Sequence, residues 1–114
     1  MISRAMASAD DFRRLALAFP GAEERAHMGH PDFRVGGKIF ATLHAPSKGT
    51  GAVMLLPEQQ EMAMDEEPGA FSPAAGAWGR SGSTMVRLDA VSGEWLERVL
   101  GWAWARRAPE DPTG

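Results

Sequence analysis

The chain contains no cysteine. Disulfide bonds and thiolate chemistry are therefore excluded, and nothing points to an oxidising compartment. No apolar run approaches the roughly 20 residues that a membrane-spanning helix needs. The first six residues also lack the apolar centre of a secretory signal. The sequence accordingly predicts a protein of the cytoplasm with no membrane partner.

Sequence motifs of catalysis are missing as well. There is no Walker sequence and no G-x-G-x-x-G pattern. The segment Gly79-Arg80-Ser81-Gly82-Ser83 departs from the Gly-x-Ser-x-Gly of a nucleophile elbow. Acids and histidines are too scattered along the chain to nominate a general acid and base. We therefore expect no enzyme activity and no cofactor.

The size and composition fit one small globular domain. The chain has 114 residues, of which 44% are hydrophobic and 24% charged, enough for one independent core and too few for two. We expect a single domain over residues 8–107, with flexible termini at 1–7 and 108–114.

The net charge of −3 disfavours strong non-specific binding to nucleic acid, which depends on neutralising phosphates. The charges are unevenly spread, however. Residues 25–48 hold four bases and one acid, whereas residues 49–71 hold five acids and no base. The bases of the first segment are Arg25, Arg34, Lys38 and Lys48. A modest basic face is therefore compatible with the acidic total.

Local patterns predict helices at the beginning, middle and end of the chain. Ser8 to Asp11 offer caps for a first helix, whose apolar positions recur at helical spacing until Pro20-Gly21. Pro57 suits the first turn of a second helix, because its missing N–H has no partner there in any case. Ser92 is placed to cap a third. On that last helix, Trp95, Val99 and Trp102 are expected to face the sheet.

Strands are predicted between the helices. Residues 32–36 and 38–45 alternate around Gly36-Gly37, a pair that suits a type I′ hairpin turn. Residues 52–56 read as a buried strand, and 84–88 as a half-buried one. Residues 22–29 are ambiguous and compatible with extended structure. Residues 70–83 read as a loop rich in small residues, with Phe71 and Trp78 as its large side chains.

Together these elements predict an α+β fold in two layers. Hairpin connections favour an antiparallel sheet, and helices near both ends of the chain favour packing on one face. The expected element order is α-β(3)-α-β(2)-α.

The ordered set of motifs resembles the MmcQ/YjbR family. It comprises Leu15 to Gly21, Gly29-His30-Pro31, Phe33-Arg34-Val35, Gly37-Lys38-Ile39-Phe40-Ala41, Gly76-Ala77-Trp78-Gly79-Arg80, Val86-Arg87-Leu88 and a final helix with tryptophans. One departure is Ser83, where family members often carry tryptophan. The resemblance implies a YjbR-like fold with a proposed double-wing DNA-binding motif.

On this resemblance, the wings are the hairpin turn at 36–38 and the loop at 76–83. Their phosphate ligands would be Arg34, Lys38, Arg80 and Arg87, with Trp78 as the apolar contact. Four such contacts would give a salt dependence with a slope of only about −3.6, at roughly −0.9 for each phosphate. The expected DNA binding is therefore weak and easily lost in salt.

A second hypothesis is a site for a small ligand or a protein partner. Trp78 lies in a loop without other large side chains, so it needs either a pocket or a partner. The site would lie between that loop and the sheet, lined by Trp78, Phe33 and His30. The acidic net charge favours this alternative over DNA.

Two further residue sets favour structural roles. His27, His30, Asp32 and His44 form only a loose set of metal ligands, so we expect packing roles and no metal; for His30 that role is a backbone hydrogen bond in a bend. Trp104 lies on the flank of the last helix, and a dimer contact there is the alternative to a structural role. The expected state is a monomer or a weak homodimer.

Overall fold

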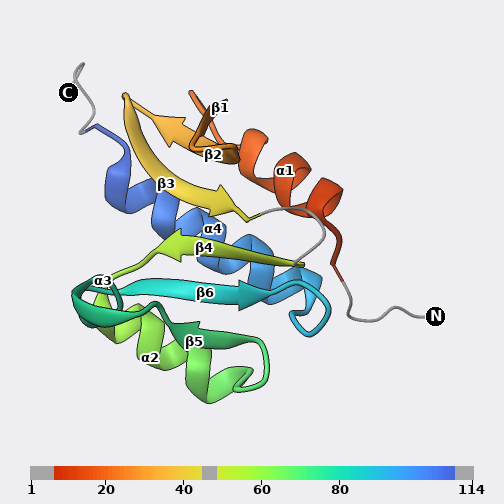
Figure 1. The fold of residues 1–114 in the computed structure, drawn as a ribbon, viewed down its shortest axis with the longest axis vertical. Coiled ribbons are helices and arrows are strands. Elements are labelled where there is room, and N and C mark those ends of the chain that lie inside the picture. The colour runs from red at the N-terminus through yellow and green to blue at the C-terminus, as the bar shows by residue number, and fades with distance from the viewer. Residues whose placement is uncertain (1–6, 45–48, 110–114) are drawn as a thin grey trace.

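The computed structural model describes residues 7–44 and 49–109 of the chain, so Lys48 of the predicted basic face lies outside the described residues. Six antiparallel strands form one sheet in the order β1-β2-β3-β4-β6-β5 (Figure 1). The strands are β1 Glu23–His27, β2 His30–Val35, β3 Lys38–Leu43, β4 Thr50–Met54, β5 Phe71–Pro73 and β6 Ser83–Arg87. The helices are α1 Ala9–Leu17, α2 Pro57–Glu66, α3 Gly76–Arg80 and α4 Gly93–Arg107.

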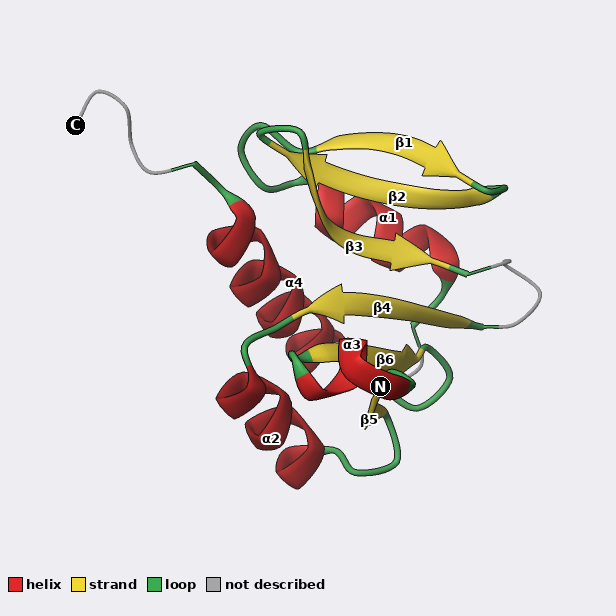
Figure 2. Cartoon of the chain, turned by 60° about the vertical axis from the view of Figure 1, so that its left-hand side comes forward, coloured by secondary structure: helices red, strands yellow, loops and turns green. Residues whose placement is uncertain are grey.

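The two-layer α+β class is confirmed. Helix α4 packs on β3 and β4, α1 on β3 and α4, and α2 on β5 and β6, which covers one face of the sheet (Figure 2). Three elements differ from the sequence prediction. The ambiguous segment forms the edge strand β1, so four strands precede α2. Within residues 70–83, where we predicted a loop, residues 71–73 form strand β5 and residues 76–80 form the short helix α3. In the described part of the chain, no helix combines the length and apolarity that crossing a membrane requires.

The long helices begin where their sequences predicted. Ser8 caps α1 in a capping box: its hydroxyl accepts from the Asp11 amide, while the Asp11 carboxylate accepts from the Ser8 amide. Pro57 occupies the first turn of α2, and the Ser92 hydroxyl accepts from the Trp95 amide at the start of α4. Local chemistry therefore sets these helix starts.

The central hairpin carries a bulge that determines which side chains reach the core. Gly36 and Gly37 both have positive φ, 59° and 81°, as a type I′ turn requires. Phe33 pairs with Ala41 but the next residue, Arg34, pairs with Ile39, which leaves Phe40 as the additional residue. Phe40 and Ala41 are thus both buried, while Ile39 stays on the same face as Arg34.

The core lies between the sheet and the helices. Its largest fully buried side chains come from α1, four strands, the residues that follow β4 and β6, and α4: Phe12, Phe33, Phe40, Leu43, Leu55, Val53, Val86, Val91, Leu96, Val99 and Leu100. The buried stripe of α4 consists of Leu96, Val99, Leu100 and Ala103. Trp95 and Trp102, which we predicted to face the sheet with Val99, pack against the margin of this core, and the Trp95 ring lies edge to face with Phe71 of β5. Both are only partly buried, and they pack edge to face beside Met62 of α2.

Candidate binding groove

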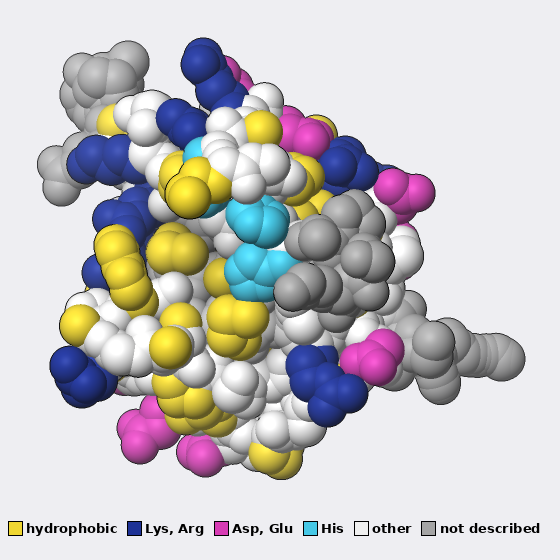
Figure 3. Space-filling model, viewed as in Figure 1, with side chains coloured by type: hydrophobic (Ala, Val, Ile, Leu, Met, Phe, Trp, Pro, Cys, Tyr) yellow, Lys and Arg dark blue, Asp and Glu magenta, His cyan; other side chains and the backbone are white. Residues whose placement is uncertain are grey.

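The face of the sheet without α1, α2 and α4 carries an open groove of about 760 Å³. Its middle is apolar and comes from three neighbouring strands: Ile39 of β3, Ala52 and Met54 of β4, and Met85 of β6. Trp78 borders it on one side, and Arg34, Lys38 and Arg107 on another. Figure 3 views this face, with hydrophobic side chains on its surface and Lys and Arg side chains around its margin. The groove thus combines an apolar floor with a cationic end.

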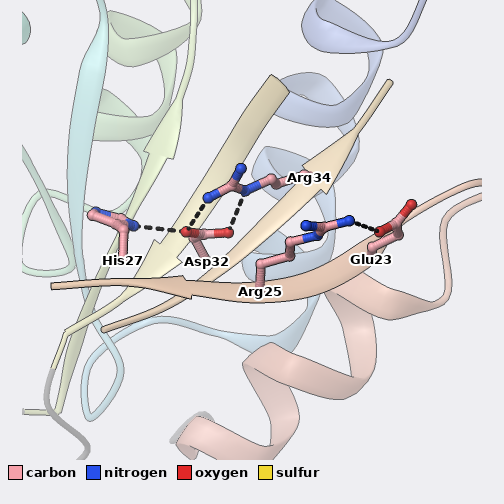
Figure 4. Close-up of polar contacts among 5 residues, drawn as sticks. All are labelled: Glu23, Arg25, His27, Asp32 and Arg34. Carbon is pink, nitrogen blue, oxygen red and sulfur yellow. Dashed lines mark hydrogen bonds and ion pairs between the residues drawn. The ribbon is translucent and has the colours of Figure 1, made fainter. Parts of the chain in front are cut away.

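A buried carboxylate fixes one cation of the groove. The Asp32 side chain is 0% exposed and accepts two hydrogen bonds from Arg34, at 2.8 Å from Nε and 3.1 Å from a terminal nitrogen (Figure 4). Nδ1 of His27 lies 2.7 Å from the Asp32 carboxylate. The hydrogen bonds from Arg34 hold the pKa of Asp32 below its usual range, against the opposing effect of burial. Arg34 is therefore bound within the protein by a charge-assisted pair.

The three histidines gather on the same face of the sheet (Figure 3). The ring of His30 lies edge to face with those of His27 and His44, at centroid distances of 6.3 and 6.0 Å. Nδ1 of His44 lies 3.0 Å from the Thr50 hydroxyl. Within residues 7–44 and 49–109, however, no three His, Cys, Asp or Glu side chains are arranged to hold a metal ion. The three histidine rings of the set that we weighed as ligands pack against one another, and His27 also lies next to Asp32.

The backbone role predicted for His30 is not what the structure has. His30 is the first residue of β2 rather than part of a bend, and the turn before it consists of Met28 and Gly29, both with positive φ. Its buried Nδ1 has no hydrogen-bond partner among the residues that the structure describes. His30 therefore acts through ring contacts with its two neighbouring histidines.

Helix α3 holds Trp78 at the margin of the groove. Trp78 is 73% exposed, so it does not fill the edge of the core. The helix is fastened from below by Gln60 of α2, a buried side chain whose amide nitrogen donates to the carbonyls of Gly79 and Ser83 at 3.0 and 3.1 Å. Sequence reasoning missed Gln60, because a single glutamine on an acidic helix gives no signal of burial.

The four predicted phosphate ligands do not form one cluster. Arg34 is paired with Asp32, and Arg87 lies 3.5 Å from the carboxylate of Asp89. Lys38, at the start of β3, lines the groove, whereas Arg80, at the end of α3, does not. Of the described residues in this set, Lys38 and Arg80 are the two without an acidic partner.

Phe33 lies elsewhere than predicted, whereas Trp104 lies partly buried on the flank of α4, as predicted. Phe33 does not line the groove: it is 0% exposed and packs against Phe12 on the helix-covered face, because its position in β2 alternates with those of Asp32 and Arg34. Trp104 stacks on Phe19 and its indole donates to the Pro20 carbonyl at 2.9 Å, so its ring is engaged within the chain.

Fold and groove define a class of protein: a small α+β domain whose single antiparallel sheet, among the described residues, has α1, α2 and α4 on one face and the groove on the other. A model of the YjbR family matches residues 17–106. The chain therefore belongs to the YjbR family.

A solved structure supports the fold. The crystal structure of protein DR2400 of Deinococcus radiodurans, with a DUF419 domain, is similar with a TM-score of 0.73 and 20% sequence identity. The similarity covers 90% of this chain and 80% of that one. No curated protein matches the chain.

Proposed function

We propose that this chain is a non-enzymatic binding domain that takes a small ligand in the open groove. The observation that carries the proposal is Trp78, a large exposed side chain at the margin of an apolar floor, on a short helix whose Gly79 carbonyl accepts a hydrogen bond from the buried Gln60. The volume of about 760 Å³ lies within the roughly 300–1,000 Å³ that is usual for ligand sites. Exposed aromatic side chains that are rigidly placed are suited to stacking on a ligand.

The proposal predicts a localised response in a ligand screen followed by two-dimensional ¹H–¹⁵N NMR. Each of the four tryptophans gives its own indole N–H signal, and loss of one signal in W78F identifies that of Trp78. Ligands should shift the Trp78 signal and the backbone amides of Ile39 and Met85, which lie in the groove. The Trp104 indole, which donates to Pro20, serves as the internal control. Shifts confined to Trp104 or spread evenly over the protein would contradict a groove site.

DNA is the second candidate, favoured by Lys38 and Arg80, which have no acidic partner in the described part of the chain. With Arg34 and Arg87 engaged by carboxylates, two phosphate contacts remain. At roughly −0.9 for each contact, the logarithm of the binding constant should fall with the logarithm of the salt concentration with a slope of about −1.8, half of that expected from four contacts.

Fluorescence anisotropy of a labelled duplex and of a single strand, from about 20 to 150 mM salt, measures this slope. The variant K38A/R80A should lose the binding. R14A/R98A makes the same change in net charge at cations that pair with Asp11 and Glu94, and should keep it. No binding of either DNA at the lowest salt would exclude this candidate. The cytoplasmic location and the monomeric or weakly dimeric state stay predictions from the sequence.

A further inference from the structure

We propose that the ligand of the groove is an amphipathic anion: an aromatic or branched apolar body that carries one carboxylate or phosphate group. The anionic group would lie between Lys38 and Arg107, and the apolar body on Ile39 and Met54 beside Trp78. This inference rests on the proposed binding function and specifies the chemistry of its ligand.

The charge of the groove supports an anion. Its lining contains three cations, Arg34, Lys38 and Arg107, and no aspartate or glutamate among the described residues. This holds in a protein whose net charge is −3, so the cationic lining opposes the overall charge. A concave surface lined by one sign of charge concentrates the opposite ion.

Lys38 and Arg107 are the two cations that a ligand can engage. Arg34 forms an ion pair with Asp32. Neither Lys38 nor Arg107 forms an ion pair in the part of the chain that the structure describes. Nε of Arg107 is buried and has no hydrogen-bond partner among residues 7–44 and 49–109. A buried donor without an acceptor costs free energy, and an anion at this point would remove that cost.

The fold brings these two residues together from opposite parts of the chain. Lys38 follows the hairpin turn, and Arg107 is the last residue of α4. The turn touches the segment after α4: a Cβ built on Gly36 would lie 3.0 Å from the Pro109 ring. Burial lowers the pKa of the neighbouring Arg106, and the charge of Arg107 adds to that effect.

The apolar floor next to this cationic end indicates that the remaining part of the ligand is apolar. Ile39 directly follows Lys38, and Met54 and Trp78 line the same groove. Methionine side chains adapt to ligands of different shape, and the exposed indole of Trp78 offers a stacking face. A ligand that is only an anion would leave this floor in water, and one that is only apolar would leave the two cations without a partner.

Three probes of one ring system separate these possibilities: 2-naphthoate, 1-naphthyl phosphate and the uncharged 2-naphthalenemethanol. Their dissociation constants are measured from the Trp78 indole signal. We expect both anions to bind about tenfold or more tightly than the alcohol, which corresponds to the contribution of hydrogen bonds to a charged group. The ratio of the dissociation constants of the two anions tells whether the site prefers a carboxylate or a phosphate.

The double variant K38A/R107A should raise the dissociation constants of both anions about tenfold or more and leave that of the alcohol unchanged. The control R14A/R98A makes the same change in net charge at cations outside the groove, which pair with Asp11 and Glu94, and should bind all three probes as the unmodified chain does. Equal affinity for the alcohol and the anions, or no effect of K38A/R107A, would overturn the anionic ligand but leave the groove as a binding site. No shift of Trp78 with any of the probes would overturn both proposals.

Discussion

Replacing Gly82 by alanine should destabilise the fold by about 3 kcal/mol or more, the range of substitutions that impose backbone strain and a clash together. Gly82 has a φ of +111°, and a Cβ built there would lie 1.9 Å from the Leu55 carbonyl oxygen. That obstacle is backbone and cannot rotate away. Leu55 is fully buried between β4 and α2, so any relief must displace the link from the sheet to α2.

Urea unfolding followed by tryptophan fluorescence measures this loss. Gly93→Ala is the matched control, because Gly93 begins α4 without a positive φ and no atom lies within 4 Å of its built Cβ. It should unfold at the same urea concentration as the unmodified chain or a slightly higher one, since alanine favours helix. A midpoint for G82A equal to that of G93A would show that the Gly82 backbone can move away from Leu55 at little cost.

The same position explains one failure of sequence reasoning. Residues 70–83 read as a loop rich in small residues, yet Gly82 and Ser83 within it are buried. The Gly82 carbonyl accepts from the Leu55 amide at 3.3 Å and from the Thr84 hydroxyl at 2.7 Å. A glycine required by a close approach and one in a free loop look alike in a sequence, because the neighbouring backbone comes from a distant segment.

Elements defined by neighbouring residues were predicted well. The turn at Gly36-Gly37, the cap at Ser8 and the proline at the start of α2 follow from local conformational preferences. Strand β1 was ambiguous because it lies at the edge of the sheet and exposes four of its five residues, which removes the alternation that identifies a strand. Helix α3 was missed because five residues show no helical period, and Gln60 holds it from elsewhere in the chain.

The groove was predictable in part. Trp78 was identified from the lack of other large side chains near it, and it lines the groove. Arg107 was not identified from the sequence, because its position in the groove depends on where α4 ends relative to the β2–β3 turn. The pairing of Asp32 with Arg34 had a signal that we did not use: residues two apart in a strand share a face, so opposite charges there predict a contact.

Replacing Asp32 by asparagine should cost about 2 kcal/mol of stability at neutral pH, the value of hydrogen bonds to a charged group. Asparagine keeps the shape of the side chain but removes the charge that Arg34 and His27 face. The exposed pair of Asp10 with Arg13, at 3.4 Å, provides the control: Asp10→Asn should change stability far less, because exposed ion pairs contribute little.

The pH dependence distinguishes loss of this charge from a general packing defect. Arg34 lowers the pKa of Asp32 in the folded state, so the ionised carboxylate stabilises the fold above the pKa of an unfolded aspartate. That contribution is lost as the pH falls through the lowered pKa. The difference in unfolding free energy between the unmodified chain and D32N should therefore be constant near neutrality and shrink from about pH 4 downward. A difference that stays the same down to pH 2 to 3 would mean that asparagine disturbs packing, and that the charge of Asp32 contributes little to holding β2 against β1.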